Sequence, residues 1–242
     1  MTSRGGVWRR LRTALLWLAC GFVAVTLLSV LALRWVRPVT TAFMAEGYVN
    51  AWLGQDFRWR ADFRWTPYER ISRHAKLAVI ASEDQKFAFH PGFDFEAIDA
   101  AVKERERGKR LRGASTISQQ VAKNLYLWPG PSFVRKGLEA YLTLLIEMLW
   151  PKQRILEMYL NVAEFAPGVY GVGAAAPRFF RTDPAHLTQE QAALLATVLP
   201  NPRRLRLEHP NAYMWRRQAW IIEQMNALGG SSYIRSVDAA ER

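Results

Sequence analysis

The chain has 242 residues, enough for one large domain or two small ones. Its 33 basic and 21 acidic residues give a formal net charge of +12, which favours an anionic partner such as a phosphate, a nucleic acid or a lipid headgroup. The single cysteine, Cys20, excludes an intramolecular disulfide framework and a metal site built from several cysteines.

The first element expected in chain order is a membrane anchor at residues 13–33. This window contains no charged residue, and about 20 apolar residues match the roughly 30 Å hydrocarbon core of a bilayer. The flanking arginines are Arg4, Arg9, Arg10 and Arg12 before the window and Arg34 and Arg37 after it. This excess favours a cytoplasmic N-terminus at residues 1–12. The alternative is a cleaved signal peptide, whose apolar region is usually only about 7–15 residues long.

Residues 34–65 form a segment in which aromatic residues and arginines alternate. Its members are Trp35, Arg37, Phe43, Tyr48, Trp52, Phe57, Arg58, Trp59, Arg60, Phe63, Arg64 and Trp65. Aromatic rings settle at headgroup level and arginine stems reach lipid phosphates, so the segment is interpreted as a membrane-proximal belt. The alternative is a set of core aromatic residues with solvated arginines.

The rest of the chain is predicted to be helical, because no stretch shows sustained alternation of apolar and polar residues. Capping signals and proline or glycine stops predict helices at residues 66–82, 94–107, 115–125, 134–150, 152–162, 188–200 and 211–228. The 94–107 helix is expected to stop near Gly108. Residues 231–242 are expected to be a loose tail. The sequence therefore predicts a mainly α fold, with an N-terminal transmembrane helix and one helical domain at residues 66–230.

Missing motifs exclude several kinds of catalytic site. The sequence contains no glycine-rich phosphate loop and no HExxH zinc motif. It also lacks the Ser-x-x-Lys and Lys-Thr-Gly motifs, so a transpeptidase or a β-lactamase is not supported. The histidines are dispersed, at positions 74, 90, 186 and 209.

Glu83 and Asp84 form a carboxylate pair at the end of the helix predicted at 66–82. The negative end of the helix macrodipole disfavours a charged carboxylate, which would raise its pKa and suit a general base near neutral pH. Nearby cations would oppose that shift. The alternative is that both carboxylates make surface ion pairs and loop hydrogen bonds.

Polar residues crowd the start of the helix predicted at 115–125. Free N–H groups at a helix N-terminus bind anions, and the hydroxyls of Ser115 and Thr116 add donors. Ser115, Gln119 and Lys123 recur at four-residue spacing and are expected on one face, where they could hold a phosphate-rich ligand. The alternative is an amphipathic helix whose polar side is solvated.

Arg135 and Glu139 lie four residues apart on the helix predicted at 134–150, and Lys136 follows Arg135. The simpler interpretation is an ion pair on the helix surface. The alternative directs a carboxylate and two cations at a cleft, with Glu83 and Glu139 as the paired carboxylates of glycosyl chemistry.

Four ordered motifs carry a resemblance to a known family. They are Glu83-Asp84-x-x-Phe87-x-x-His90-x-Gly92, Arg112-Gly113-x-Ser115-Thr116-Ile117-x-Gln119-Gln120, Arg135-Lys136-x-x-Glu139 and Ile155-Leu156-Glu157-x-Tyr159-Leu160-Asn161. Together they resemble the motif series of the peptidoglycan glycosyltransferases over roughly residues 39–229. With one anchor and no transpeptidase motif, the chain looks like the monofunctional form of that family.

The resemblance implies a lysozyme-like α-helical glycosyltransferase domain. The implied substrate is lipid II, a disaccharide-peptide on a polyprenyl pyrophosphate, which is added to a growing glycan chain with inversion and release of the lipid pyrophosphate. Glu83 matches the family's general base, and Glu139 matches the second catalytic glutamate, which orients the donor or helps to hold its pyrophosphate. The implied substrate-binding residues are Asp84, Phe87, His90, Ser115, Thr116, Gln119, Gln120, Lys123, Asn124, Arg135, Lys136 and Asn161.

The resemblance also implies the surroundings of the enzyme. No cofactor is required, although a divalent cation, Mg²⁺ or Mn²⁺, could assist at the donor pyrophosphate. The implied partners are lipid II, the growing glycan chain, membrane lipid and other cell-wall synthases, and not nucleic acid. The implied location is the cell inner membrane, with the catalytic domain in the periplasm.

Some alternatives and departures remain. One alternative is a lytic, lysozyme-like peptidoglycan hydrolase that uses a glutamate as an acid. Another is a membrane-tethered binder of nucleic acid, suggested by the charge of +12. Ala166, Gly173 and Pro177 depart from the family's pattern, and Phe179-Phe180-Arg181-Thr182 stands where Tyr-Phe-Gly-Lys is frequent. These departures are expected to affect one wall of the cleft, and Pro177 could break a helix there.

Overall fold

The structure is a computed structural model that describes residues 4–107 and 115–240. Arg112 and Gly113 of the second motif, and the helix stop expected near Gly108, lie outside the described residues. The chain divides into two compact units, Met1–Pro38 and Val39–Arg242, and each is described by itself.

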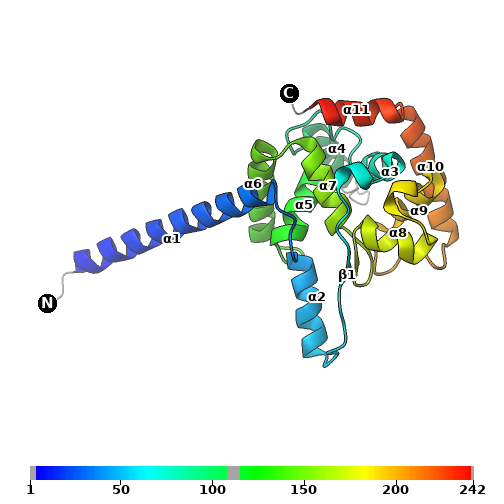
Figure 1. Cartoon of the computed structure of the whole chain (residues 1–242). Coiled ribbons are helices and arrows are strands. Elements are labelled where there is room, and N and C mark those ends of the chain that lie inside the picture. The colour runs from blue at the N-terminus through cyan, green and yellow to red at the C-terminus, as the bar shows by residue number, and fades with distance from the viewer. Residues whose placement is uncertain (1–3, 108–114, 241–242) are drawn as a thin grey trace. The chain divides into compact units, whose positions relative to one another are not determined.

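The first unit consists of one long helix, α1, which spans Arg4–Leu33 (Figure 1). Within it, Trp8–Leu33 is long and apolar enough to cross a membrane. Its large apolar side chains are exposed, among them Leu15, Trp17 and Leu28. Because apolar side chains surround the helix rather than line one face, α1 is compatible with a single-pass membrane anchor.

The second unit is mainly α-helical, as the sequence predicts. Its α-helices are α2 (Ala42–Leu53), α3 (Arg73–Glu83), α4 (Phe95–Glu106), α5 (Ile117–Tyr126), α6 (Phe133–Leu149), α7 (Lys152–Val162), α8 (Val172–Phe180), α9 (Gln189–Val198), α10 (Ala212–Ala227) and α11 (Ser231–Ala239). Two short 3₁₀ helices span Tyr68–Arg70 and Pro184–His186. Three strands are β1 (Asp62–Phe63), β2 (Glu164–Ala166) and β3 (Val169–Tyr170).

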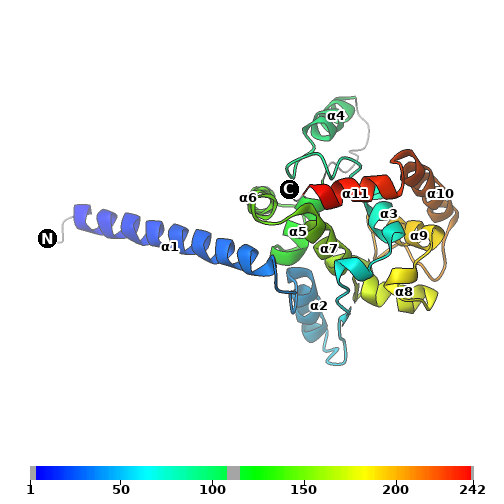
Figure 2. The ribbon, with the colours of Figure 1, turned by 45° about the horizontal axis from the view of Figure 1, so that its top comes forward.

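The core lies where the helices pack around α5 and α7. Helix α5 packs on both α6 and α7, while α9 packs on α3 and α10. Figure 2 shows α5 and α7 side by side within this unit. The side chains of α7 are largely buried, from Ile155 to Val162. This packing places the ends of α3, α5 and α6 close to one another, although they are distant in sequence.

The three strands form one small sheet in the order β1-β3-β2. Strand β1 runs parallel to β3, with Asp62 opposite Val169, and β2 runs antiparallel to β3. The helical prediction misses these strands, because two or three residues are too few to show a two-residue period.

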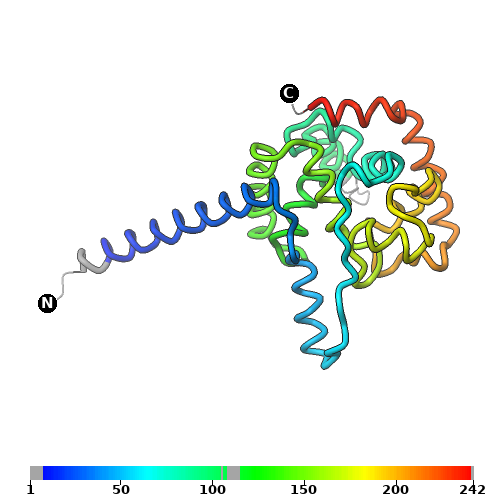
Figure 3. The backbone as a smooth tube through the Cα atoms, viewed as in Figure 1, coloured from blue at the N-terminus to red at the C-terminus, as the bar shows by residue number. Residues whose placement is uncertain are grey.

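The belt predicted at 34–65 divides into exposed and packed residues. Helix α2 and the extended segment that follows it run side by side in the tube of Figure 3, and a Cβ atom on Gly47 would lie 2.5 Å from the Trp59 ring. Trp52 and Phe57 lie where helix α2 ends and the extended segment begins, and they are 66% and 64% exposed. Phe43 is half-buried within the unit. The segment therefore contains both exposed and packed aromatic residues, and its contact with a membrane stays a prediction.

The helix predicted at 66–82 begins seven residues later, at Arg73. The backbone N–H of Thr66 donates to Oδ1 of Asn161 over 2.7 Å, so Thr66 is tied to α7 and does not open the helix. Ser72 caps α3 instead, since its hydroxyl accepts from the N–H of His74.

The loose tail predicted at 231–242 is wrong for the described residues, because residues 231–239 form α11. Tyr233, Ile234 and Val237 on this helix are buried. The hydroxyl of Tyr233 donates to the carbonyl of Gln85 over 2.8 Å and accepts from the N–H of Ala88 over 3.2 Å. The glycines that precede α11 make a turn between two helices rather than an end to the fold.

Candidate active site

Glu83 is the last residue of α3, and its side chain is half-buried beside α5. Nε2 of Gln120 donates to Oε2 of Glu83 over 2.9 Å, and the other end of that amide accepts from the Tyr159 hydroxyl over 3.2 Å. Burial raises the pKa of Glu83, while the Gln120 hydrogen bond and the charges of Arg217 and Lys123 oppose the rise. The direction agrees with the expectation from sequence, but the main cause is loss of solvation rather than the helix dipole.

Lys123, on α5, joins the surroundings of the two glutamates. Burial lowers the pKa of its ammonium group, and the negative charges of Glu139 and Glu83 raise it. The positive charges of Arg135 and Lys136 lower the pKa of Lys123 further. The ends of α3 and α6 therefore bring both carboxylates and three cations within electrostatic reach of one another.

Glu139 is a buried ion-pair partner rather than a residue of an open helix surface. Its side chain is 4% exposed, and its Oε2 accepts from Nη1 of Arg135 over 2.9 Å. Nζ of Lys136 donates to Oε1 of the same carboxylate. Because two cations share one buried carboxylate, this end of α6 carries net positive charge.

Asp84 connects the end of α3 to the start of α5. Its Oδ1 pairs with Nε2 of His90 at 2.8 Å, and its Oδ2 accepts from the backbone N–H of Ile117 over 2.9 Å. Asp84 and His90 are both buried. Asp84 therefore fixes the position of the neighbouring Glu83, and His90 holds Asp84 from the following loop.

The N-terminus of α5 differs from the prediction in two respects. The helix begins at Ile117, so Ser115 lies before it and does not share a face with Gln119 and Lys123. Thr116 and Gln119 form a reciprocal capping box, in which each side chain bonds the other residue's backbone N–H. The N–H groups of Thr116, Ile117 and Gln119 are thus bonded to the protein's own oxygens, which leaves fewer donors at this helix end for the predicted anion.

Two predicted substrate-binding residues are wholly buried. Phe87 has no exposed surface, and Nζ of Lys152 lies 4.7 Å from the centroid of its ring. Asn161 also has no exposed surface, and its amide donates to the carbonyls of Thr66 and Glu157 over 2.9 Å. Neither predicted substrate-binding side chain is open to a ligand in this structure, and every polar group of the Asn161 side chain is used inside the fold.

Two pockets meet at the hydrogen bond between Glu83 and Gln120. The first, of about 340 Å³, is lined by Gln120, Lys123 and Asn124 of α5 together with residues that include Tyr159 and Arg203. The second, of about 170 Å³, is lined by Glu83 with residues that include Asp84, Ser115, Thr116 and Trp220. Lys123 and Arg203 therefore line the pocket that Gln120 shares, and an indole ring lines the pocket that Glu83 shares.

Four residues of this region are not among the predicted site residues. They are Tyr159, Arg203, Arg217 and Trp220. Tyr159 belongs to the fourth motif, where its hydroxyl signals a polar partner. The sequence gives no signal for the other three, because they reach this region only when the chain folds. Helix α10 then packs on α3, and residues 199–203 line a pocket with α5.

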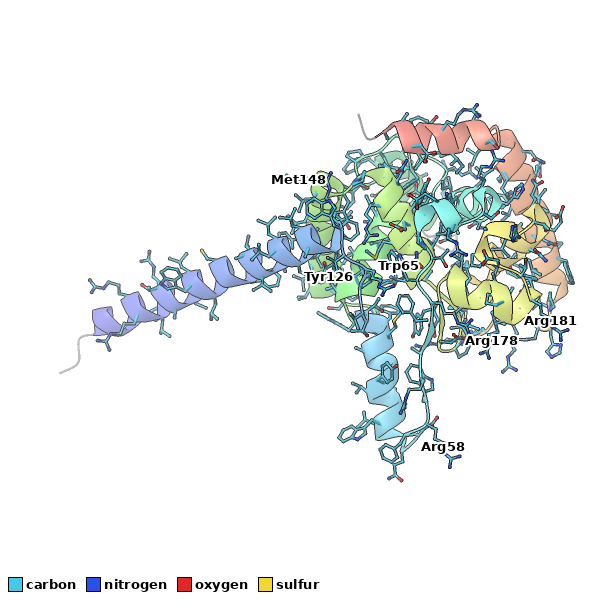
Figure 4. The ribbon with its side chains drawn as sticks, viewed as in Figure 1. Arg58, Trp65, Tyr126, Met148, Arg178 and Arg181 are labelled. Atoms are coloured by element: carbon cyan, nitrogen blue, oxygen red, sulfur yellow. The ribbon has the colours of Figure 1, made fainter. Side chains whose placement is uncertain are left out.

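The departures from the family's pattern concern another pocket. Gly173 and Pro177 line a pocket of about 510 Å³ together with residues that include Arg64, Arg70 and Arg181. A Cβ atom on Gly173 would lie 2.0 Å from the Arg64 carbonyl oxygen, so this close packing requires a glycine. Helix α8 runs through Pro177 to Phe180, so the expected break is wrong. Figure 4 labels Arg178 and Arg181 at this helix.

Protein ligands for a metal ion do not gather in the part of the chain that the structure describes. No three His, Cys, Asp or Glu side chains there lie close enough together to hold one. Glu139 is already paired with Arg135 and Lys136, a set that suits a diphosphate better than a protein-held cation.

Comparisons with known proteins agree with one another. Residues 53–226 match the family described as Transglycosylase. A biosynthetic peptidoglycan transglycosylase of Pseudomonas savastanoi pv. phaseolicola is 52% identical over 237 residues, which cover 98% of each chain. Proteins of the same name from Pseudomonas entomophila and Xanthomonas axonopodis pv. citri are 52% and 50% identical, with 97% and 94% of each chain covered.

Proposed function

The chain belongs to the transglycosylase family, and from this premise we propose how it builds the glycan chains of peptidoglycan. It is a peptidoglycan glycosyltransferase that polymerises glycan. Its relatives are named as biosynthetic enzymes, and neither the lytic hydrolase nor the nucleic-acid binder gains support from them.

The proposed substrate is lipid II, a disaccharide-peptide carried on a polyprenyl pyrophosphate. The acceptor's 4-hydroxyl attacks the donor's anomeric carbon, and Glu83 takes the hydroxyl proton as the new C–O bond forms. The bond from the anomeric carbon to the pyrophosphate oxygen breaks, and the pyrophosphate leaves with the electron pair. Attack opposite to the leaving group inverts the anomeric carbon.

The leaving pyrophosphate develops negative charge, so it needs fixed positive charge where the bond breaks. Lys123, Arg135 and Lys136 supply that charge in this proposal, with Glu139 holding the two α6 cations in place. The side chain of Lys136 is 49% exposed, so a ligand can reach its ammonium group while that group is paired with Glu139. If a divalent cation assists, the pyrophosphate oxygens would hold it.

The observation that carries this proposal is the Gln120 side chain, which lines a pocket together with Lys123 and donates to Oε2 of Glu83 over 2.9 Å. A general base must be ionised at the working pH, yet burial favours the protonated form of Glu83. Gln120, Arg217 and Lys123 oppose that effect and favour the carboxylate form, which accepts a proton. In this proposal the departing pyrophosphate meets Lys123 in the pocket that Lys123 and Gln120 line.

We place the domain at the outer surface of the inner membrane. Four arginines precede the apolar segment and two follow it, which favours a cytoplasmic N-terminus. Phe133, Leu144 and Met148 lie on one face of α6 and are 99%, 50% and 78% exposed, an apolar surface that suits contact with lipid. Figure 4 labels Met148 on this helix and Arg58 just beyond the end of α2.

The test is polymerisation of labelled lipid II in detergent by the full chain. The wild-type protein is expected to make long glycan that lysozyme digests, and to release no fragments from purified sacculi. Glu83→Gln is expected to lose about 100-fold or more of the rate, because the amide cannot accept the proton. Glu223→Gln, an exposed position on α10, is the matched control and is expected to retain the wild-type rate.

Near-wild-type polymerisation by Glu83→Gln would remove Glu83 from the role of base. Absence of polymer from a folded wild-type protein, or release of soluble fragments from sacculi, would contradict the proposed reaction as a whole.

A further inference from the structure

Trp220 lies next to the proposed base, although it comes from the other end of the domain sequence. It lines the pocket of about 170 Å³ that Glu83 also lines, with Ser115 and Thr116 among the polar residues there. Trp220 is 37% exposed, so part of its indole ring is open to a ligand. An exposed aromatic ring beside hydroxyl and carboxylate groups is the composition of a ligand pocket.

Arg217 holds the position of this ring. The guanidinium of Arg217 lies 4.2 Å from the centroid of the Trp220 ring. Nη2 of the same arginine donates to the carbonyl of Ser82 over 3.1 Å, and Ser82 precedes Glu83. Trp220 is therefore held at a set position relative to the carboxylate, as a preorganised contact requires.

We infer that Trp220 is a substrate-contacting residue, on whose ring the acceptor sugar stacks while its hydroxyl faces Glu83. The C–H bonds on one face of a pyranose are weakly positive and apolar, and the face of an indole ring is electron-rich, so the two attract. Ser115, which lines the same pocket, offers a hydroxyl group to the polar edge of the same sugar. This inference rests on the proposed function.

The arrangement also separates the two substrates. Lys123, one of the cations proposed to receive the pyrophosphate, lines the other pocket, across the Glu83–Gln120 hydrogen bond. The indole pocket contains Asp84 and Asp94 as well as Glu83, which disfavours a diphosphate there. A neutral sugar is the part of the substrate that suits this pocket.

The experiment compares Trp220→Ala, Trp220→Phe and Trp215→Ala in steady-state polymerisation of labelled lipid II by the full chain. Trp215 is the matched control, since it lies on the same helix, is 51% exposed and is not among the described residues that line the pocket. Trp220→Ala is expected to raise KM about fivefold or more, because a stacking contact of aromatic size is lost. Trp220→Phe retains a ring and is expected to stay within about threefold of the wild-type KM.

A pH profile separates a sugar contact from an indirect effect through Arg217. If Trp220→Ala leaves KM unchanged and only moves the acidic limb of the rate, Trp220 supports Arg217 and the inference is overturned. A KM equal to that of Trp215→Ala, in the same assay where the wild type polymerises, also overturns it. Failure of the wild type itself would instead contradict the proposed function.

Discussion

Arg217 of α10 donates a hydrogen bond to the carbonyl of Ser82, one residue before Glu83, over 3.1 Å. Through this contact a helix near the C-terminus holds a positive charge beside the carboxylate that ends α3. The charge lowers the pKa of Glu83 against the effect of burial. The reactivity of the proposed base therefore depends on the packing of α10 on α3.

Replacing Arg217 is expected to shift the pH dependence of the rate. A general base works in its ionised form, so the rate falls as the pH falls through the pKa of Glu83. Arg217→Met removes a charge that lowers this pKa, so the pKa rises and the acidic limb moves to higher pH. Rates measured across pH values check this, with Arg216→Met, an exposed neighbour, as the control. An unmoved limb in Arg217→Met would contradict the electrostatic role.

Glu83→Gln is expected to stabilise the fold at neutral pH. The pKa of Glu83 is raised above its ordinary value of 4.5, so the folded state favours the protonated form. The contribution of that form to stability is fully present below pH 4.5 and is lost as the pH rises through the raised pKa. Melting temperatures are therefore expected to agree at pH 4 and to be higher for the variant at pH 7.5. A lower melting temperature of the variant at pH 7.5 would contradict the raised pKa.

Lys136→Ala is expected to reduce kcat/KM about 10- to 100-fold, with a change of melting temperature below about 3 °C. Its side chain is half exposed, and Arg135 remains to pair with the buried Glu139, so the fold loses little. Lys103→Ala removes another exposed lysine with a carboxylate partner and serves as the control. A fall in melting temperature that accounts for the lost rate would show a structural role instead.

Asn161→Ala is expected to destabilise the fold by about 2–4 kcal/mol, which lowers the melting temperature by roughly 5–10 °C. The change leaves the buried N–H and C=O of Thr66 without their amide partner. Thermal unfolding measures the loss, and Asn226→Ala, which removes an exposed amide pair, is the control. A slow enzyme with wild-type stability would restore Asn161 to the substrate groove.

A reporter enzyme that is active only outside the cytoplasm, fused after Arg242, is expected to be active in cells. The arginine excess before α1 predicts that orientation. Replacing Arg9 and Arg10 by Gln leaves two basic residues on each side of the apolar segment and is expected to reduce the reporter signal. An inactive reporter on the unaltered chain would contradict the proposed topology.

The local signals in the sequence predict several elements to within one residue. Pro151 and the apolar spacing after it place α7 at residues 152–162, and the capping box at Thr188 opens α9 as predicted. Thr66 shows the limit of such signals, because its backbone N–H bonds to Asn161, a partner 95 residues away. A capping motif cannot reveal a competing partner that only the folded chain supplies.

The residues of the candidate site also divide into those that the sequence predicts and those that only the fold brings to the site. Glu83, Gln120 and Glu139 could be chosen from motif order, and the structure brings their surroundings together at Lys123. Arg217 could not be chosen in this way, since its proximity to Glu83 arises from the packing of two helices. Phe87 belongs to a motif but packs in the core, where it is fully buried and does not contact a ligand. Motif order alone does not distinguish core residues from ligand-binding ones.

The docking of α11 has a practical consequence for truncation and tagging. Tyr233 bonds to Gln85, two positions after the proposed base, across a sequence separation of 148 residues. A protein shortened by its last ten residues would lose that hydrogen bond, and the Glu83 carboxylate would become more mobile. Affinity handles therefore belong beyond a spacer at this end, and protease trimming of the C-terminus would register first as slower glycan synthesis.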